Sequence, residues 1–240
     1  MMIRLSQILC AAFAAALVLP MLAMPNAARA EDNKPPEGFV ALFDGKDLAG
    51  WKGLVADPPK RHKMSADELA TAQKKADQVM RDHWSAQDGV LVFDGKKGGE
   101  NICTAKDYGN FEMKVDWKIL PKGDSGVYLR GSPQVQIWDT TELSYRKHGN
   151  EKGSGSLWNN EKHERFPLVF ADKPLGEWNH FDIKMVGDQV TVDLNGKRVT
   201  DTVLENYWER DKPIYPKEQI ELQNHGNPLY FKNIYIKELP

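Results

Sequence analysis

The chain has 240 residues, of which 41% are hydrophobic and 28% charged, with 32 basic and 34 acidic side chains and a formal net charge of −2. This balance excludes the strongly basic surface with which proteins bind nucleic acid or an anionic membrane. The length is sufficient for one sizeable domain with its own hydrophobic core.

Residues 1–30 have the pattern of a secretory signal peptide. An apolar run over 8–23, interrupted by Pro20, follows Arg4, and Ala28-Arg29-Ala30 supplies small residues at the cleavage positions. The run is short for a membrane span of about 20 residues. We therefore expect cleavage after residue 30, export to a bacterial periplasm or secretion, and no membrane span in the mature chain.

The mature part, residues 31–240, is expected to form a single domain without disulfides. Removal of the two leader arginines leaves 30 basic and 34 acidic residues, a net charge of −4. Cys103 is the one cysteine that remains, so no internal disulfide can form. A lone cysteine in a strand-like segment is typical of a small core residue.

Short segments of alternating apolar and polar residues dominate the mature chain. With 7 Trp, 7 Tyr and 9 Phe, they predict an all-β, antiparallel jelly-roll β-sandwich. Gly187-Asp188 and Asn195-Gly196 have the composition of hairpin turns. The predicted strands lie at 39–43, 50–52, 89–93, 102–104, 111–119, 126–131, 134–139, 178–186, 189–194, 199–203, 219–226 and 228–239.

One helical segment interrupts this pattern. Ser65 and Glu68 form a capping box ahead of apolar residues at helical spacing, which continue to about His83. A basic loop that contains two prolines comes before it. We expect residues 58–83 to be an insertion into the β fold, either a lid at the rim of the functional site or a surface ornament.

Three of the predicted strands carry an unusual set of side chains on the face away from the core. An ordinary solvated face is rich in Lys, Thr and Ser, whereas this one has amides, aromatic rings, a carboxylate, a guanidinium and an imidazole. Such groups can bind and activate a polyhydroxylated ligand, and a mixed solvated face is the alternative. The set comprises Tyr128, Arg130, Gln134, Gln136, Trp138, Glu221, Gln223 and His225.

Several catalytic signatures are absent from the sequence. It has no glycine-rich phosphate loop, dinucleotide-binding fingerprint, nucleophile elbow or His-Glu-x-x-His motif. Conventional glycosidases use two carboxyl groups, and Asp116, Asp124, Asp139 and Glu221 are available, but the sequence does not pair them. Asp116 fits a solvated charge, and Asp124 fits a turn residue. A divalent metal held by Glu221 and His225 is a further alternative.

Several segments, in order along nearly the whole mature chain, resemble one known family, the 3-keto-disaccharide hydrolase or 3-keto-glycoside lyase domain. This resemblance implies a concanavalin A-like jelly roll, in agreement with the predicted sandwich. The helical segment departs from the shortest members of the family, so it is a place where sugar preference can differ. The segments are Phe39–Trp51, Asp124–Gly131, Gln134–Asp139, Gly176–Asn179, Leu194–Gly196, Ile220–Gly226 and Phe231–Ile236.

The resemblance implies cleavage of glycosides that carry a ketone at C3. The ketone acidifies the C2 proton, so a base can remove it and expel the C1 aglycone, after which water adds to the enone. Such a site needs a base near C2 and a donor or cation near the enolate oxygen. As hypotheses, His225 or Glu221 is the base and Arg130, with or without a divalent metal, stabilises the enolate. The substrate-binding residues would be Asp124, Tyr128, Gln136, Trp138, Asp139, Trp158 and Gln223.

Two other functions remain open on the sequence. A non-catalytic carbohydrate-binding module and a conventional hydrolase of unoxidised glycans can use the same fold. The combination of carboxylate, imidazole and guanidinium favours an enzyme. In each case the expected partner is a sugar rather than nucleic acid, and the oligomeric state is open.

Overall fold

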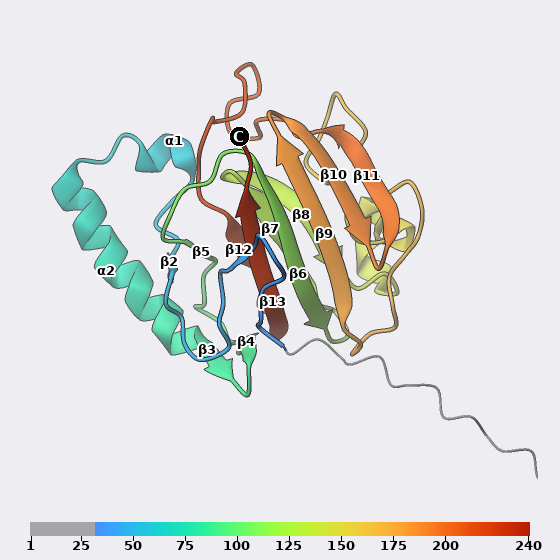
Figure 1. Cartoon of the computed structure of the whole chain (residues 1–240), viewed down its shortest axis with the longest axis horizontal. Coiled ribbons are helices and arrows are strands. Elements are labelled where there is room, and N and C mark those ends of the chain that lie inside the picture. The colour runs from blue at the N-terminus through green and yellow to red at the C-terminus, as the bar shows by residue number, and fades with distance from the viewer. Residues whose placement is uncertain (1–31) are drawn as a thin grey trace, which may run out of the picture. The chain divides into compact units, whose positions relative to one another are not determined.

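The polypeptide forms two facing antiparallel sheets in a computed structural model, which describes residues 32–240 (Figure 1). The predicted signal peptide lies outside the described residues. In chain order the elements are β1 (Val40–Ala41), β2 (Trp51–Gly53), α1 (Pro58–Arg61), α2 (Ala66–His83), β3 (Trp84–Gln87), β4 (Val90–Phe93), β5 (Ile102–Thr104), β6 (Phe111–Ile119), β7 (Asp124–Leu129), β8 (Ser132–Trp138), η1 (Leu143–His148), η2 (Asn150–Lys152), β9 (Asn179–Val186), β10 (Gln189–Leu194), β11 (Lys197–Val203), β12 (Glu221–Asn224) and β13 (Leu229–Glu238).

The two sheets differ in size. The larger has the order β11-β10-β9-β6-β13-β4-β3, with β1 paired to β13, and the smaller has the order β2-β5-β12-β7-β8. Both predicted hairpin turns form, because Val186 pairs with Gln189 and Leu194 pairs with Lys197. The antiparallel jelly-roll sandwich predicted from the sequence is therefore confirmed. No helix within residues 32–240 is long and apolar enough to cross a membrane.

The core lies between the sheets and follows the alternation of the strands. In β6 the residues from Phe111 to Ile119 alternate between buried and partly exposed along the whole strand. Burying one face of each sheet against the other removes a large apolar area from water, the main stabilising contribution to such a fold. The smaller sheet contributes Val127, Leu129, Val135, Ile137 and Leu222, each 0% exposed.

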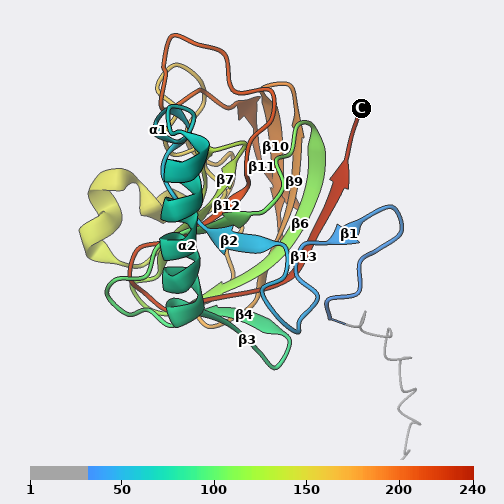
Figure 2. The ribbon, with the colours of Figure 1, turned by 90° about the vertical axis from the view of Figure 1, so that its left-hand side faces the viewer.

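The predicted insertion forms two helices at one side of the sandwich (Figure 2). Helix α2 begins as predicted, since the Ser65 side chain accepts a hydrogen bond from the Glu68 N–H and the Glu68 side chain accepts one from the Ser65 N–H. The short helix α1 takes the place of the expected loop, with prolines in its first turn, where no intrahelical N–H bond is lost. Gly53 allows β2 to approach α2 closely, because a Cβ there would lie 2.1 Å from the Ala76 carbonyl oxygen.

The outer face of the larger sheet carries a network of charged side chains. Asp116 accepts hydrogen bonds from His180 Nδ1 at 2.5 Å and from Asn233 Nδ2 at 2.7 Å. His180 Nε2 also lies 3.3 Å from an Asp182 carboxylate oxygen. Asp116 is therefore a partnered group rather than the solvated charge expected from the sequence.

Replacing His180 with glutamine should destabilise the fold near neutral pH but not in alkali. Partial burial acts to lower the pKa of His180, but the hydrogen bonds to Asp116 and Asp182 raise it to about 9, above the ordinary 6.5. The protonated imidazole therefore contributes stability that is fully present below about pH 6.5 and is lost as the pH rises through about 9. We expect a loss of about 1 kcal/mol, because the side chain is 37% exposed and water screens its charge. Urea unfolding at about pH 6 and pH 10 measures it, and an equal loss at both would contradict the assignment.

Candidate active site

A cavity of about 230 Å³ opens on the face of the smaller sheet that points away from the core. Its floor comes from β7, β8 and β12, and its walls come from η1 and from loops near residues 158 and 207. Helices α1 and α2 contribute no residue to the described lining. The lining residues are Asp124, Tyr128, Pro133, Gln134, Gln136, Trp138, Tyr145, His148, Trp158, Asn159, Tyr207, Trp208, Gln223 and His225.

Strand register brings the floor residues together. β7 is the middle strand of the three, and its Gly126 lies opposite Gln136 on β8 and Gln223 on β12. Directly opposite residues share one face of a sheet. Seven of the ten predicted site residues line this one cavity, and their roles remain predictions: Asp124, Tyr128, Gln136, Trp138, Trp158, Gln223 and His225.

A chain of hydrogen bonds leads to a carboxyl group beside an imidazole. Gln134 Nε2 donates to Gln136 Oε1, and Gln136 Nε2 donates to Asp124 Oδ1 at 2.8 Å. The other Asp124 oxygen lies 3.8 Å from His225 Nδ1. Burial raises the pKa of Asp124 above its ordinary value, although His225, the bond from Gln136 and His148 each act to lower it. Because burial disfavours the ionised carboxylate, a positive charge that forms on the neighbouring imidazole would stabilise it.

The floor also holds buried hydrogen-bond acceptors. Gln223 Nε2 donates to the Tyr128 hydroxyl at 3.2 Å, while Gln223 Oε1 and Gln134 Oε1 are buried without a partner among the described residues. Buried acceptors without a donor cost free energy, so ligand hydroxyls that donate to them would be stabilised. The described lining contains no lysine or arginine. The cavity therefore suits a neutral, hydroxyl-rich ligand better than an anion.

Aromatic side chains form the walls. Trp138 and Trp158 meet edge to face with ring centroids 6.4 Å apart, and His148 meets Trp158 at 5.5 Å. Tyr207 and Trp208 form a second edge-to-face pair at 4.8 Å. Such rings provide large, rigid apolar surfaces that can contact the C–H face of a sugar ring.

Sequence reasoning missed several wall residues. Tyr145 and His148 lie on η1, and Asn159, Tyr207 and Trp208 lie in irregular segments. Hydrophobic periodicity says nothing about such segments, because their residues follow neither strand nor helix spacing. The one available signal is the number of aromatic residues in loops that would otherwise be polar.

Arg130 is not in the cavity, which corrects its assignment to the enolate oxygen. It is the first residue of the turn between β7 and β8, with a φ of 48° at Arg130 and 70° at Gly131, while Leu129 pairs with Ser132. Positive φ at both central residues is the geometry of a two-residue hairpin turn. The strand alternation therefore ends before Arg130, whose side chain donates to the carbonyl oxygens of Gly187 and Pro216.

Asp139 also lies outside the cavity lining and organises the loop after β8. Its side chain accepts hydrogen bonds from the Lys122 N–H at 2.8 Å and from the Thr141 N–H and hydroxyl at 2.8 and 2.6 Å. Burial acts to raise the pKa of Asp139, but these bonds and one from the Glu142 backbone lower it below its ordinary value. The assignment of Asp139 to the substrate is thus corrected to a structural role.

Glu221 is buried beside the cavity rather than exposed to it. It is 1% exposed, and its cross-strand neighbours are Tyr128 and Cys103. Its Oε2 has no hydrogen-bond partner within the described structure. Burial raises the pKa of Glu221 to about 8, although the nearby Arg61 acts to lower it. Glu221 therefore does not reach a ligand in this cavity, which leaves His225 as the predicted base that does.

A shared metal at Glu221 and His225 is not supported by the strand geometry. Glu221 is buried on β12 outside the cavity lining, whereas His225 lies in the bend after this strand and lines the cavity, so the two side chains do not converge. Among residues 32–240, no group of three or more His, Cys, Asp or Glu side chains could hold a metal ion.

Replacing Glu221 with glutamine should stabilise the fold in alkali relative to the unchanged chain. The pKa of about 8 lies above the ordinary 4.5, so the folded state holds this proton more tightly than the unfolded state does. The buried carboxyl therefore destabilises the fold increasingly as the pH rises from about 4.5 through about 8. Urea unfolding at about pH 5 and pH 9 should show a difference that grows with pH. A difference independent of pH would show that Glu221 is not protonated in the fold.

The fold and the cavity together define a jelly-roll sandwich with a carbohydrate-type pocket on the smaller sheet. The chain belongs to the 3-keto-alpha-glucoside-1,2-lyase-like domain family, which matches residues 38–237. It is therefore an enzyme, and the strong resemblance seen in the sequence is confirmed.

Individual relatives agree with this membership. A 3-keto-disaccharide hydrolase of Bacteroides thetaiotaomicron is 24% identical, and the match covers 85% of this chain and 79% of that protein. Two candidate glycosyl hydrolases of Parabacteroides distasonis ATCC 8503 have similar solved structures. One has a TM-score of 0.61 at 24% identity, with 88% of this chain and 100% of the other covered. The second has a TM-score of 0.55 at 27% identity, with 79% and 99% covered.

Proposed function

We propose that the chain cleaves 3-keto-glycosides, including 3-keto-disaccharides, by elimination across C1 and C2 followed by hydration. The family and the name of the Bacteroides relative support this substrate class. The observation that carries the mechanism is the His225–Asp124 pair at the edge of a cavity otherwise lined by amides and aromatic rings.

His225 is the base in this proposal. Its Nδ1 faces Asp124, so its Nε2 is the nitrogen that takes the C2 proton, and the Asp124 carboxylate stabilises the imidazolium that forms. The electron pair of the C2–H bond first passes to the C3 carbonyl oxygen as the enolate. It then forms the C1=C2 double bond as the C1–O bond breaks, and the aglycone oxygen leaves with the C1–O electron pair and takes a proton from solvent. Half of the His225 side chain is exposed, so the proton can pass to solvent before water adds to the enone.

The other cavity residues orient the sugar. The unpartnered oxygens of Gln134 and Gln223 accept hydrogen bonds from ring hydroxyls, and Trp138 and Trp158 contact the apolar face of the ring. His148 replaces Arg130 as the proposed donor to the enolate oxygen, because it lines the cavity close enough to Asp124 to influence its pKa.

The test compares a 3-keto-glucoside with its unoxidised parent in deuterated water. We expect aglycone release from the keto compound alone, with deuterium incorporated at C2 because the C2 proton is lost and replaced. Release with hydrogen retained at C2 would overturn the elimination mechanism. Release from the unoxidised glycoside would indicate a conventional hydrolase, and binding without release would indicate a binding module.

We also propose that the enzyme acts after export, on the basis of the signal-peptide pattern in residues 1–30. Expression with the leader in a Gram-negative host should give a periplasmic protein that begins at Glu31. A cytoplasmic protein that retains its first thirty residues would contradict export.

A further inference from the structure

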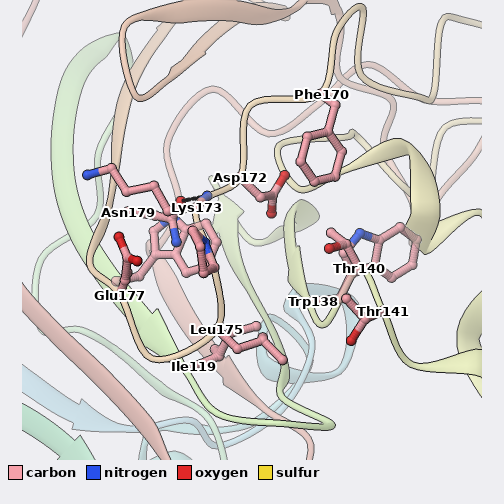
Figure 3. A pocket seen from close by; sticks show the side chains of 12 residues that line it. Ile119, Trp138, Thr140, Thr141, Phe170, Asp172, Lys173, Leu175, Glu177 and Asn179 are labelled. Atoms are coloured by element: carbon pink, nitrogen blue, oxygen red, sulfur yellow. Dashed lines mark hydrogen bonds between the residues drawn. The ribbon is translucent and has the colours of Figure 1, made fainter.

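A second cavity, of about 250 Å³, adjoins the proposed active site at Trp138 and otherwise has its own lining residues (Figure 3). Its walls come from the ends of β6 and β8, the start of β9 and the segment 170–177. Trp138 is the one described residue that lines both cavities. The proposed reaction uses none of the other residues around this second cavity.

Three of the twelve residues that line the second cavity are aromatic. Trp117, Trp138 and Phe170 all line it. Phe170 is 51% exposed and continues a run of exposed apolar residues formed with Leu168 (58%) and Val169 (47%). Three consecutive exposed apolar side chains beside a cavity are unusual for a surface that contacts water alone.

One carboxyl group faces these rings. In Figure 3 the Asp172 carboxyl group lies between Phe170 and Trp138, whereas the ends of the Lys173 and Glu177 side chains extend away to the opposite side. Asp172 Oδ2 accepts the Ser154 N–H at 2.9 Å. Burial raises the pKa of Asp172 above its ordinary value, because the carboxyl group has lost hydrogen bonds from water. A ligand hydroxyl that donates to this carboxyl group would replace one of those hydrogen bonds.

The wall also contains a buried hydrogen-bond donor. Trp117 is 1% exposed, and its Nε1 has no hydrogen-bond partner in the described part of the chain. An indole N–H can only donate, so this atom needs an acceptor. The residues that line the cavity thus include aromatic side chains, an acceptor at Asp172 and, at Trp117, a buried donor without a partner.

We propose that this second cavity binds a neutral pyranose ring, at a carbohydrate site separate from the active site. A pyranose has an apolar C–H face for the aromatic rings and hydroxyl groups around its edge that both accept and donate. At about 250 Å³ the cavity is as large as the proposed active site, at about 230 Å³, so its volume suits a sugar ring equally well. Asp172 disfavours anionic sugars. The proposal does not depend on the reaction at the first cavity.

Indole N–H resonances in a ¹H–¹⁵N correlation spectrum test the site directly. The chain has 7 tryptophans, and Trp117→Phe identifies the Trp117 signal. Titration with unoxidised glucose and cellobiose should shift this signal, with a dissociation constant on the order of 1 mM for so small a ligand. Phe170→Ala and Asp172→Asn should each weaken binding by about 10-fold. Phe170 is exposed and Asp172 is partly exposed, so the weaker binding of these two variants tests the site even where Trp117→Phe does not fold, through any indole signal that responds to sugar.

Controls separate the two cavities. Val186→Ala removes a comparably exposed apolar side chain at the other end of β9 and should leave the titration unchanged. His225→Ala should also leave the Trp117 shift intact, while Phe170→Ala should keep normal aglycone release from a 3-keto-glucoside. The proposal is overturned if the Trp117 indole signal does not respond to sugar, or if phenol shifts this signal and sugars do not. It is also overturned if the Phe170→Ala and Asp172→Asn variants bind sugar as tightly as the unchanged chain.

Discussion

Replacement of His225 by alanine should lower the turnover of a 3-keto-glucoside by about 10²–10⁴-fold, the usual contribution of a general base. His225 is the histidine whose Nδ1 lies 3.8 Å from the Asp124 carboxylate at the cavity. Steady-state kinetics should show the loss mainly in kcat, because the amides and aromatic rings that hold the sugar remain. The unchanged chain should lose activity toward acid pH as its base becomes protonated. The His225→Ala variant should not show this loss.

His163→Ala is the matched control, because His163 is a similarly exposed histidine paired with Glu205 outside the cavity. This variant should retain normal turnover. Asp124→Asn should lower turnover less than His225→Ala, because the imidazolium that forms during the reaction loses its carboxylate partner. A near-normal rate for the His225→Ala variant would show that His225 is not the base. The carboxyl group of Asp124 would then be the next candidate.

Replacement of Arg61 by alanine should lower the free energy of unfolding by about 3 kcal/mol, as expected when one partner of a buried ion pair is removed. Arg61 Nη2 lies 2.7 Å from Glu218 Oε2, and both side chains are less than 10% exposed. Arg61 also lowers the pKa of the buried Glu221 carboxyl. The variant therefore leaves two buried acids without their arginine. This loss of unfolding free energy is at the lower end of the range for buried ion pairs, because His62 and the Gln219 N–H still contact Glu218.

Urea unfolding measures the effect. The slope of the unfolding free energy against urea concentration should not change, which shows that the variant exposes the same surface on unfolding. Lys60→Ala, an exposed position on the same short helix, should change stability by less than about 0.5 kcal/mol. A loss for Arg61→Ala as small as the loss for Lys60→Ala would show that α1 does not stabilise the sheet through this pair.

Local patterns predicted the parts of the fold that local physics decides. Alternation over 111–119 produced β6 with the expected buried face, and the Ser65–Glu68 capping box marked the start of α2. Asn195-Gly196 formed the turn between β10 and β11. Each of these features depends on backbone geometry and on neighbours within a few residues, so the sequence carries the whole signal.

The same reasoning failed where the chain changes direction. Alternation put Arg130 on the face with Gln136, but a turn at Arg130 and Gly131 sends its side chain toward Gly187. Glu221 has the predicted register, yet its side chain is buried at 1% exposure. Whether a polar side chain is exposed or covered depends on which distant segment packs over it, and strand periodicity contains no such information.

The amino-acid sequence alone determined the sandwich, its core-facing residues and the polar character of the face formed by β7, β8 and β12. Only the tertiary structure decided which of those polar groups share a cavity. His148, Tyr207 and Trp208 come from segments without periodicity, and the Asp124–His225 contact joins residues about a hundred positions apart. Contacts between distant segments depend on the packing of the whole chain, whereas strands and caps depend on neighbouring residues.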